Sequence, residues 1–394
     1  MTNKTAFVVR GRAAVRGFSI VELLVGMVIA LLATIVIMQV LTNSEAGRRA
    51  TGGLTDSQTS GLLGLFAIER DLQQAGYGLA GLPSLGCSIR AGGDLDGRLL
   101  NPAAIIPDGA APGSPENPWG IPPGDAGSDI IVVAYGNPTT SSEGSLLTNT
   151  ATASPYRIDS ILGLSIGEYL LIAESGANCT LGRVTATNAV DSSVTLDFGA
   201  GVNYTLQSAR AYSLGRAPRF VAYAVRNGSL TVCDFLANDC GDAGSANDGD
   251  VWVPVASDVV AVVAQYGWDT TAIPDKAVDS YCKGRLTPAA AACPAGDDGS
   301  PAAGNSGLAQ GLRACDWNRV LAIRVAVVSR SGQYEKDEVS PATIKLWQDS
   351  AAVPATTGPE YTPDDRHYRY RVANTTVALR NLLWMKVVGS PCAA

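Results

Sequence analysis

Histidine is almost absent from this chain, and so are the motifs that commonly build a metal or catalytic centre. His367 is the sole histidine among 394 residues, which leaves neither a relay of two histidines nor a histidine-rich metal site. No CxxC sequence occurs, so a Cys/His zinc site lacks its usual ligand spacing. These absences argue against an enzyme and against a zinc domain, and no cofactor is expected.

Charged and aromatic side chains are also scarce. Charged residues make up 16% of the chain and aromatic residues 6%, whereas there are 43 glycines and 21 prolines. This composition excludes charge-rich disorder and indicates a protein with many turns and loops. The length allows one large head or two lobes.

The few charges are distributed unevenly along the chain. Lys4, Arg10, Arg12 and Arg16 lie in the first 17 residues, which hold no acid. The rest of the chain has 25 basic and 36 acidic residues, a net charge of −11. Such an acidic surface repels phosphate backbones, so nucleic acid is not an expected partner.

One apolar segment stands out at residues 18–41, where Glu22 is the single charge in 24 positions. At about 1.5 Å per residue this helix is long enough to cross a hydrocarbon core of about 30 Å. The preceding basic residues predict a cytoplasmic N-terminus and a head on the periplasmic side of the inner membrane. A secretory signal peptide is the alternative, with Ser44 and Ala46 imitating its cleavage site, but its apolar region is typically shorter. A plain membrane anchor is the other alternative.

Glu22 distinguishes between these possibilities. An ionised carboxylate is costly in an apolar helix and is normally kept with a partner or a function. The sequence RGFSIVELLVGMVIALL, residues 16–32, closely resembles the type IV prepilin processing motif. The resemblance implies that a prepilin peptidase cleaves between Gly17 and Phe18 and methylates the new amine of Phe18. It also implies that Glu22 neutralises such an amine on a neighbouring subunit during fibre assembly.

The segment after the apolar run predicts an interrupted helix. Gly47, Gly52 and Gly53 lower the helical propensity, so we expect a kink or a melted stretch there. The helix should resume near Leu54 and stop at Gly76 and Gly78. Its apolar stripe recurs at three- and four-residue steps. The stripe consists of Leu62, Leu65, Ile68, Leu72 and Ala75.

A second resemblance narrows the family. The sequence IERDLQQAGYG, residues 68–78, is similar to the RDxRxAGY signature of the PilW minor pilins, with Gln73 where a basic residue is common. Residues 166–185, 264–269 and 317–331 extend the similarity, and residues 368–382 resemble the closing strand that ends in the LRN of Leu379 to Asn381. The resemblance implies an α+β, pilin-like fold, in which a long N-terminal helix packs on an antiparallel β-sheet head with long loop insertions.

The sequence itself also indicates a β-rich head. Short β-branched runs bounded by turn residues predict strands at residues 129–135, 168–173, 194–198 and 319–330. Residues 220–233 form the strongest hairpin signal, because Asn227 and Gly228 separate two alternating runs. Residues 101–128 and 287–310 are rich in proline, glycine and alanine and are expected to be long surface loops.

These expectations divide the chain into four parts. Residues 1–17 are the basic leader, 18–41 the transmembrane and fibre-core helix, 42–76 the second half of that helix, and 77–394 the periplasmic or extracellular β-rich head.

All eight cysteines lie beyond the apolar segment, and an even number fits disulfides in an oxidising compartment. Free buried thiols and metal ligation are the alternatives, and the pairing stays open. The disulfide candidates are Cys87, Cys179, Cys233, Cys240, Cys282, Cys293, Cys315 and Cys392.

Three short patterns suggest chemistry but are better explained without it. Ser165 lies in GLSIG, which fits a nucleophile elbow, yet a strand and not a helix is expected to follow. His367 lies among charged residues and is expected to be a solvated residue at a strand entry. The acidic loop from Asn238 to Asp250 could gather oxygen ligands for Ca²⁺, but it lacks the EF-hand spacing and is expected to be solvated.

Two further sets of residues could form binding surfaces. The tryptophans Trp252, Trp268, Trp317, Trp347 and Trp384 are expected to be core residues. Arg366, Arg369 and Arg371 alternate with Tyr368 and Tyr370, which could project a basic row towards DNA or an acidic partner. An edge strand that faces another pilin subunit is the favoured interpretation.

The function that these observations favour is a minor pilin, an assembly component that primes a type IV pilus and lies near its tip. Its expected partners are the prepilin peptidase, the inner-membrane assembly platform, other minor pilins, the major pilin and a tip adhesin. A minor pseudopilin of type II secretion is the close rival. A tip-located adhesive or ligand-binding module is a rival of a different class, suggested by the insertions. Adhesion and twitching motility would be downstream processes.

Overall fold

The computed structural model describes thirteen stretches of the chain. They are residues 19–79, 85–114, 116–138, 144–149, 152–174, 177–198, 202–205, 208–269, 271, 275–283, 317, 319–347 and 359–383. The chain divides into two compact units, Met1–Gly52 and Gly53–Ala394. Each is described by itself.

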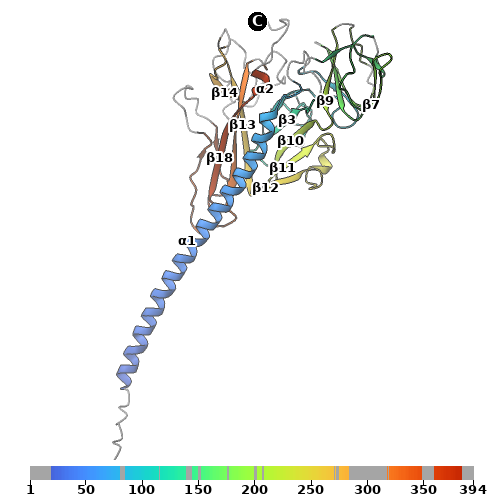
Figure 1. Ribbon diagram of the computed structural model, residues 1–394. Coiled ribbons are helices and arrows are strands. Elements are labelled where there is room, and N and C mark those ends of the chain that lie inside the picture. The colour runs from blue at the N-terminus through green and yellow to red at the C-terminus, as the bar shows by residue number, and fades with distance from the viewer. Residues whose placement is uncertain are drawn as a thin grey trace, which may run out of the picture. The chain divides into compact units, whose positions relative to one another are not determined.

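A single helix, α1 (Ile20–Gln74), spans 55 residues and is drawn in blue in Figure 1. It runs through Gly47, Gly52 and Gly53, so the expectation of a melted stretch and a restart near Leu54 is wrong. Each glycine costs about 1 kcal/mol relative to alanine, which the cooperative hydrogen bonding of so long a helix offsets. The boundary between the two compact units nevertheless falls between Gly52 and Gly53.

The second unit, the head, is built mainly from β-strands. Their bounds are β1 (Ile89–Arg90), β2 (Ala103–Ile106), β3 (Ile130–Tyr135), β4 (Ser145–Leu146), β5 (Tyr156–Arg157), β6 (Tyr169–Ala173), β7 (Cys179–Asn188), β8 (Ser193–Leu196), β9 (Arg210–Gly215), β10 (Arg219–Arg226), β11 (Ser229–Asp234), β12 (Val253–Ser257), β13 (Val259–Trp268), β14 (Ser280–Cys282), β15 (Val320–Arg330), β16 (Ile344–Lys345), β17 (Glu360–Tyr361) and β18 (Tyr370–Ala378). A short 3-10 helix, η1 (Ala243–Ser245), and the helix α2 (Arg380–Leu383) complete the elements. The α+β fold with an antiparallel, strand-rich head is therefore confirmed.

The first sheet has the strand order β12-β11-β10-β3-β2 and is antiparallel throughout. Strands β10 and β11 form the predicted hairpin. Asn227 and Gly228 take positive φ angles of 52° and 70° at its turn, which a type I′ turn requires at both central positions. The predicted strand at residues 129–135 is β3, whose residues are all buried.

The second sheet has the order β14-β13-β15-β18, and Asp129 connects it to the first. The backbone N–H of Asp129 donates to the carbonyl oxygen of Val262 at 2.7 Å, and its Oδ2 accepts the N–H of Ala264 at 3.0 Å. One continuous core lies between the two sheets and the C-terminal part of α1, and Leu65 and Ile68 of α1 belong to it. Figure 1 shows β10, β11, β13 and β18 beside this part of the helix.

A third sheet has the order β4-β9-β6-β7-β8-β5, which belongs to an insertion, and β1 from the preceding segment pairs with β7. Strands β3 and β10 are hydrogen-bonded neighbours, so residues 136–218 leave the first sheet and return to it. We call residues 136–218 the accessory module. It has its own apolar core around Tyr156, Ile172 and Val194.

The proline-rich residues 101–128 are not the surface loop that their composition suggests. They contain β2, and Trp119 and Ile121 are fully buried. The guanidinium of Arg226 donates to the carbonyl oxygens of Pro122 and Pro123 at 2.8 and 3.1 Å. These hydrogen bonds hold a segment without periodicity against the sheet. Residues 287–310, the second expected loop, lie outside the described residues.

Candidate functional site

The N-terminal part of α1 is an apolar helix with nothing packed on it in the isolated chain. Residues Ile20–Thr42 have a mean hydropathy of 2.8 and are not buried. By length and composition this helix can cross a membrane. Such a surface requires lipid or other apolar helices around it, because water would contact it at a cost of about 25 cal/mol per Å².

Glu22 lies in the first turn of α1 and is exposed in the isolated chain. An acid here is favoured by the helix dipole by about 0.3–1 kcal/mol, which offers a local role besides pairing with an amine. Gly17 and Phe18 lie outside the described residues. Cleavage, methylation and the assembly role of Glu22 therefore remain predictions.

The C-terminal part of α1 docks on the head through the predicted stripe, with one correction. Leu65, Ile68, Leu72 and Ala75 are buried, but Leu62 is 52% exposed. At this level of the helix Gly61, and not Leu62, faces the sheet. An added Cβ at Gly61 would lie 2.9 Å from Oγ of Ser329. The absence of a side chain lets the helix backbone approach the sheet.

A buried carboxylate, Asp71, lies in the middle of this docking face. Its side chain is fully buried and accepts hydrogen bonds from the hydroxyls of Tyr223 at 2.7 Å and Tyr135 at 3.2 Å. Arg70 forms an ion pair with it at 3.0 Å. Burial, reinforced by the nearby carboxylate, raises the pKa of both tyrosines, so they remain donors. Asp71 thereby fixes α1 against β3 and β10.

The end of α1 explains two features of the signature around residues 75–77. Gly76 has a φ of 77°, and a Cβ there would lie 2.9 Å from Cδ2 of Leu382. The amide of Asn381 donates to the carbonyl oxygens of Gln74 and Ala75, both at 3.2 Å. The LRN sequence after β18 thus satisfies carbonyl groups that the helix end leaves without partners.

Disulfides are present in the head. Cys87 pairs with Cys179 and Cys233 with Cys240, and Cys282 is also disulfide-bonded. The remaining three cysteines lie outside the described residues. They are Cys293, Cys315 and Cys392.

The three patterns considered for chemistry do not come together as a site. Ser165 precedes strand β6, so the helix that an elbow requires is absent. The ring of His367 stacks on Tyr334 with centroids 5.0 Å apart. In the acidic loop, Asp242 and Asp248 accept N–H groups of their own loop. Within the described part of the chain, no group of three or more His, Cys, Asp or Glu side chains is arranged to hold a metal.

The aromatic and basic candidates also have structural roles. Trp252, Trp268 and Trp317 are buried as expected, Trp347 is half-buried, and Trp384 lies outside the described residues.

The expectation that Arg366, Arg369 and Arg371 project together from one strand is wrong. Arg366 and Arg369 precede β18 and pair with Glu338 at 2.6 Å and Glu335 at 3.2 Å. Only Arg371 of the three lies within the strand, and it is exposed. Among the described strands β18 is nevertheless at the edge of its sheet, as the favoured interpretation expected, and its contact with another subunit stays a prediction.

Asp71 and Gly61 were not singled out from the sequence as docking residues. An acid directly before a buried leucine of an apolar stripe was the available signal for Asp71. Gly61 gave none, since its role depends on the distance to Ser329.

These features define a class of protein: a head of antiparallel sheets on a helix that is long and apolar enough for a membrane, which is the architecture of a pilin. The family model of PilW, described as type IV pilus-assembly protein W, matches residues 222–381. Over these residues the chain is similar to the PilW family, which supports a type IV pilus-related protein. The match begins in β10, ends in α2 and leaves the accessory module outside. No curated protein and no solved structure gives a significant match.

Proposed function

We propose that this protein is a minor pilin that helps to initiate type IV pilus assembly and lies at or near the tip of the fibre. The observation that carries the proposal is an exposed apolar helix, with Glu22 as its only charge, joined to a head that is similar to the PilW family. A prepilin peptidase cuts between Gly17 and Phe18, and the amine of Phe18 is methylated.

Assembly follows from the charges at the start of the processed helix. The carboxylate of Glu22 and the amine of a neighbouring Phe18 are each costly in an apolar environment, and pairing offsets much of that cost. The inner-membrane platform presents the subunit, and other minor pilins and the major pilin supply neighbours. A tip adhesin is a further partner of this arrangement.

Replacing Glu22 tests the proposal. In cells that express only the variant protein, Glu22→Ala and Glu22→Gln should each reduce surface pili at least about tenfold. The glutamine variant removes the charge with little change in side-chain size, so it separates the loss of charge from the loss of the side chain. Glu45→Ala, in the same helix beyond the apolar segment, is the control. Piliation that survives Glu22→Gln would contradict charge pairing.

Mass spectrometry of sheared fibres tests the processing steps. The N-terminal peptide should begin at N-methyl-Phe18, and the protein should be present in the fibres. An intact leader on assembled protein would contradict the proposal. Loss of exoprotein secretion with normal piliation in a deletion strain would assign the protein to a type II secretion pseudopilus instead.

A further inference from the structure

A cavity of about 830 Å³ opens in the head, where the accessory module meets two loops from outside it. Its walls come from residues 91–98, from the loop at 235–239, and from Tyr169, Arg183 and Phe198 on or beside the accessory strands. We call it the accessory groove.

Two disulfides fix the walls of the accessory groove. Cys87–Cys179 joins the segment before β1 to the first residue of β7. Cys233–Cys240 closes the loop that carries Asn238. These cross-links restrict the motion of two of the three walls. A ligand therefore loses less binding free energy to ordering those walls.

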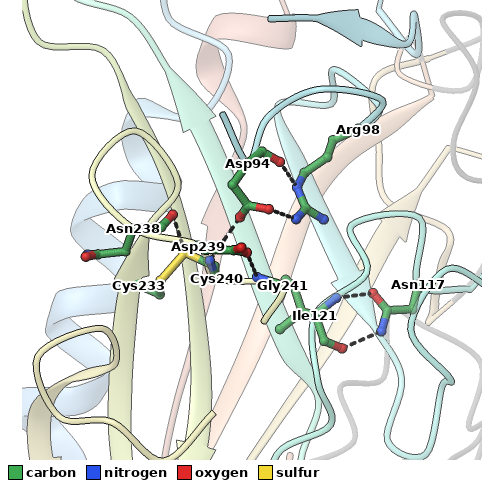
Figure 2. A network of polar contacts seen from close by, with 9 residues as sticks. All are labelled: Asp94, Arg98, Asn117, Ile121, Cys233, Asn238, Asp239, Cys240 and Gly241. Carbon is green, nitrogen blue, oxygen red and sulfur yellow. Dashed lines mark hydrogen bonds and ion pairs between the residues drawn. A yellow bond between two sulfur atoms is a disulfide. The ribbon is translucent and has the colours of Figure 1, made fainter. Parts of the chain in front are cut away.

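A buried ion pair connects the first wall to the second. Arg98 pairs with Asp94, whose Oδ2 also accepts the N–H of Cys240 at 2.9 Å (Figure 2). The guanidinium of Arg98 stacks over the ring of Phe235 at 5.0 Å. A Cβ at Gly241 would lie 2.5 Å from Nη2 of Arg98, so a larger residue there would displace this guanidinium. The lining is therefore preorganised before any ligand arrives.

Part of the charge around the accessory groove is compensated within the protein. Asp94 is paired with Arg98, and Asp96 lies 3.5 Å from Arg90. The lining carries no excess of basic residues that would favour a phosphate or nucleic acid. Asp197 and Asp239 also line it, without an ion pair among the described residues, so the lining carries a small excess of acid whose oxygens can accept hydroxyl groups. A ligand without negative charge fits this field best.

The remaining lining groups suit a ligand with hydroxyls and an apolar face. Within the described residues, the hydroxyl of Tyr169 and the side-chain carboxamide of Asn238 make no hydrogen bonds, and Asp197 uses only Oδ1, which accepts the N–H of Arg183 at 2.6 Å. Half-exposed Phe198 and Leu236 add apolar surface. Carboxylate and amide groups bind hydroxyls, and an aromatic ring contacts the C–H face of a sugar ring.

We propose that the accessory groove binds a neutral oligosaccharide. This function goes beyond pilus assembly, and its walls lie mostly outside the residues that match the PilW family.

A substitution that fills the accessory groove tests the proposal. Gly92 lies on its rim with ordinary φ, and a Cβ there would be 3.8 Å from Cδ2 of Phe198. Gly92→Trp should therefore cover Phe198 without straining the backbone. Gly249→Trp is the matched control, because Gly249 is exposed and has nothing within 4 Å of an added Cβ.

The measurement is binding of maltohexaose, cellohexaose and chitohexaose to the full-length protein in detergent micelles, by calorimetry and saturation-transfer NMR. At least one sugar should bind, and Gly92→Trp should weaken it at least about tenfold while Gly249→Trp leaves it unchanged. Phe198→Ala should also weaken it. Circular dichroism confirms that each variant is folded.

Three results would overturn the inference. They are no binding of any of the three sugars, equal binding by the two tryptophan variants, and binding of only a hexalysine peptide or a heparin fragment in the accessory groove. Because the assay uses purified protein, its failure leaves the assembly proposal untouched.

Discussion

At the scale of single residues, the buried Asp71 carboxylate is the most consequential polar group in the head. It accepts two tyrosine hydroxyls from different strands and pairs with Arg70. Removing an acceptor leaves buried donors unsatisfied, which costs more than the hydrogen bonds gained on folding. Asp71 therefore determines how α1 lies on the first sheet, in addition to the apolar stripe.

We expect Asp71→Ala to lower the free energy of unfolding by about 2–4 kcal/mol, because the hydroxyl of Tyr135 loses its acceptor and that of Tyr223 keeps only the carbonyl oxygen of Ala67 at 3.3 Å. Asp71→Asn retains one acceptor oxygen and should cost less. Urea unfolding followed by tryptophan fluorescence measures both. Glu69→Ala is the control, since Glu69 accepts a hydrogen bond from Gln73 of the same helix and from no other side chain in the described part of the protein. A loss at Asp71 no larger than that at Glu69 would show that the network contributes little.

At the scale of elements, the docking of α1 depends on small residues as much as on large ones. An added Cβ at Gly64 would lie 3.0 Å from Cδ2 of Leu230, and one at Gly61 would lie 2.9 Å from Oγ of Ser329. The helix is thus closest to the sheets where it has no side chains. A glycine that costs helical propensity is retained here because a larger residue would push the helix outward.

The same substitution at two glycines of α1 should give opposite results. Gly61→Leu should destabilise the head by about 2–3 kcal/mol, because the new side chain meets Ser329 and Ala373. Gly52→Leu should be neutral or stabilising by up to about 1 kcal/mol, since nothing lies within 4 Å of its Cβ. Chemical denaturation of the two proteins gives the comparison. Equal effects would mean that helix propensity, and not close packing, determines the outcome.

The helices, strands and turns could be predicted where the residues that determine them are neighbours in sequence. The Asn227–Gly228 turn, the fully buried β3 and the helix end at Gly76 each follow from residues that are neighbours in sequence. Residues 101–128 were misjudged because their burial depends on Arg226, about a hundred residues away, which donates to two proline carbonyls. The predicted apolar stripe is confirmed except at Leu62. Whether that residue is buried depends on the distance between the helix and the sheet.

At the scale of the whole molecule, the PilW family model matches residues 222–381, whereas the accessory module lies outside the match, inserted between the neighbouring strands β3 and β10. Glu22 and the apolar run were recognisable from a motif within one helix. The accessory groove was not, because its walls come from segments far apart in the sequence, which the Cys87–Cys179 disulfide and the hydrogen bond from the N–H of Cys240 to Asp94 bring together. A single sequence does not contain that pairing.

Buried tyrosines distributed over the whole head predict a loss of stability in alkali. Burial raises the pKa of Tyr204, Tyr223, Tyr266 and Tyr361, and it raises the pKa of Tyr212 to about 12. A pKa that is higher in the folded state stabilises the protein below the unfolded value of about 10, and this contribution is lost as the pH rises towards the folded value. Stability should therefore fall steeply above pH 10.

Tyr212→Phe tests one contribution to this loss while keeping the aromatic packing of β9. Between pH 9 and pH 11.5 the wild-type protein should lose about 2 kcal/mol more than the variant, since a shift from about 10 to about 12 corresponds to that difference. Urea unfolding at several pH values measures the two slopes. Tyr334→Phe, at a residue 59% exposed, should follow the wild type. Parallel curves for wild type and Tyr212→Phe would show that this hydroxyl ionises equally in the folded and unfolded states.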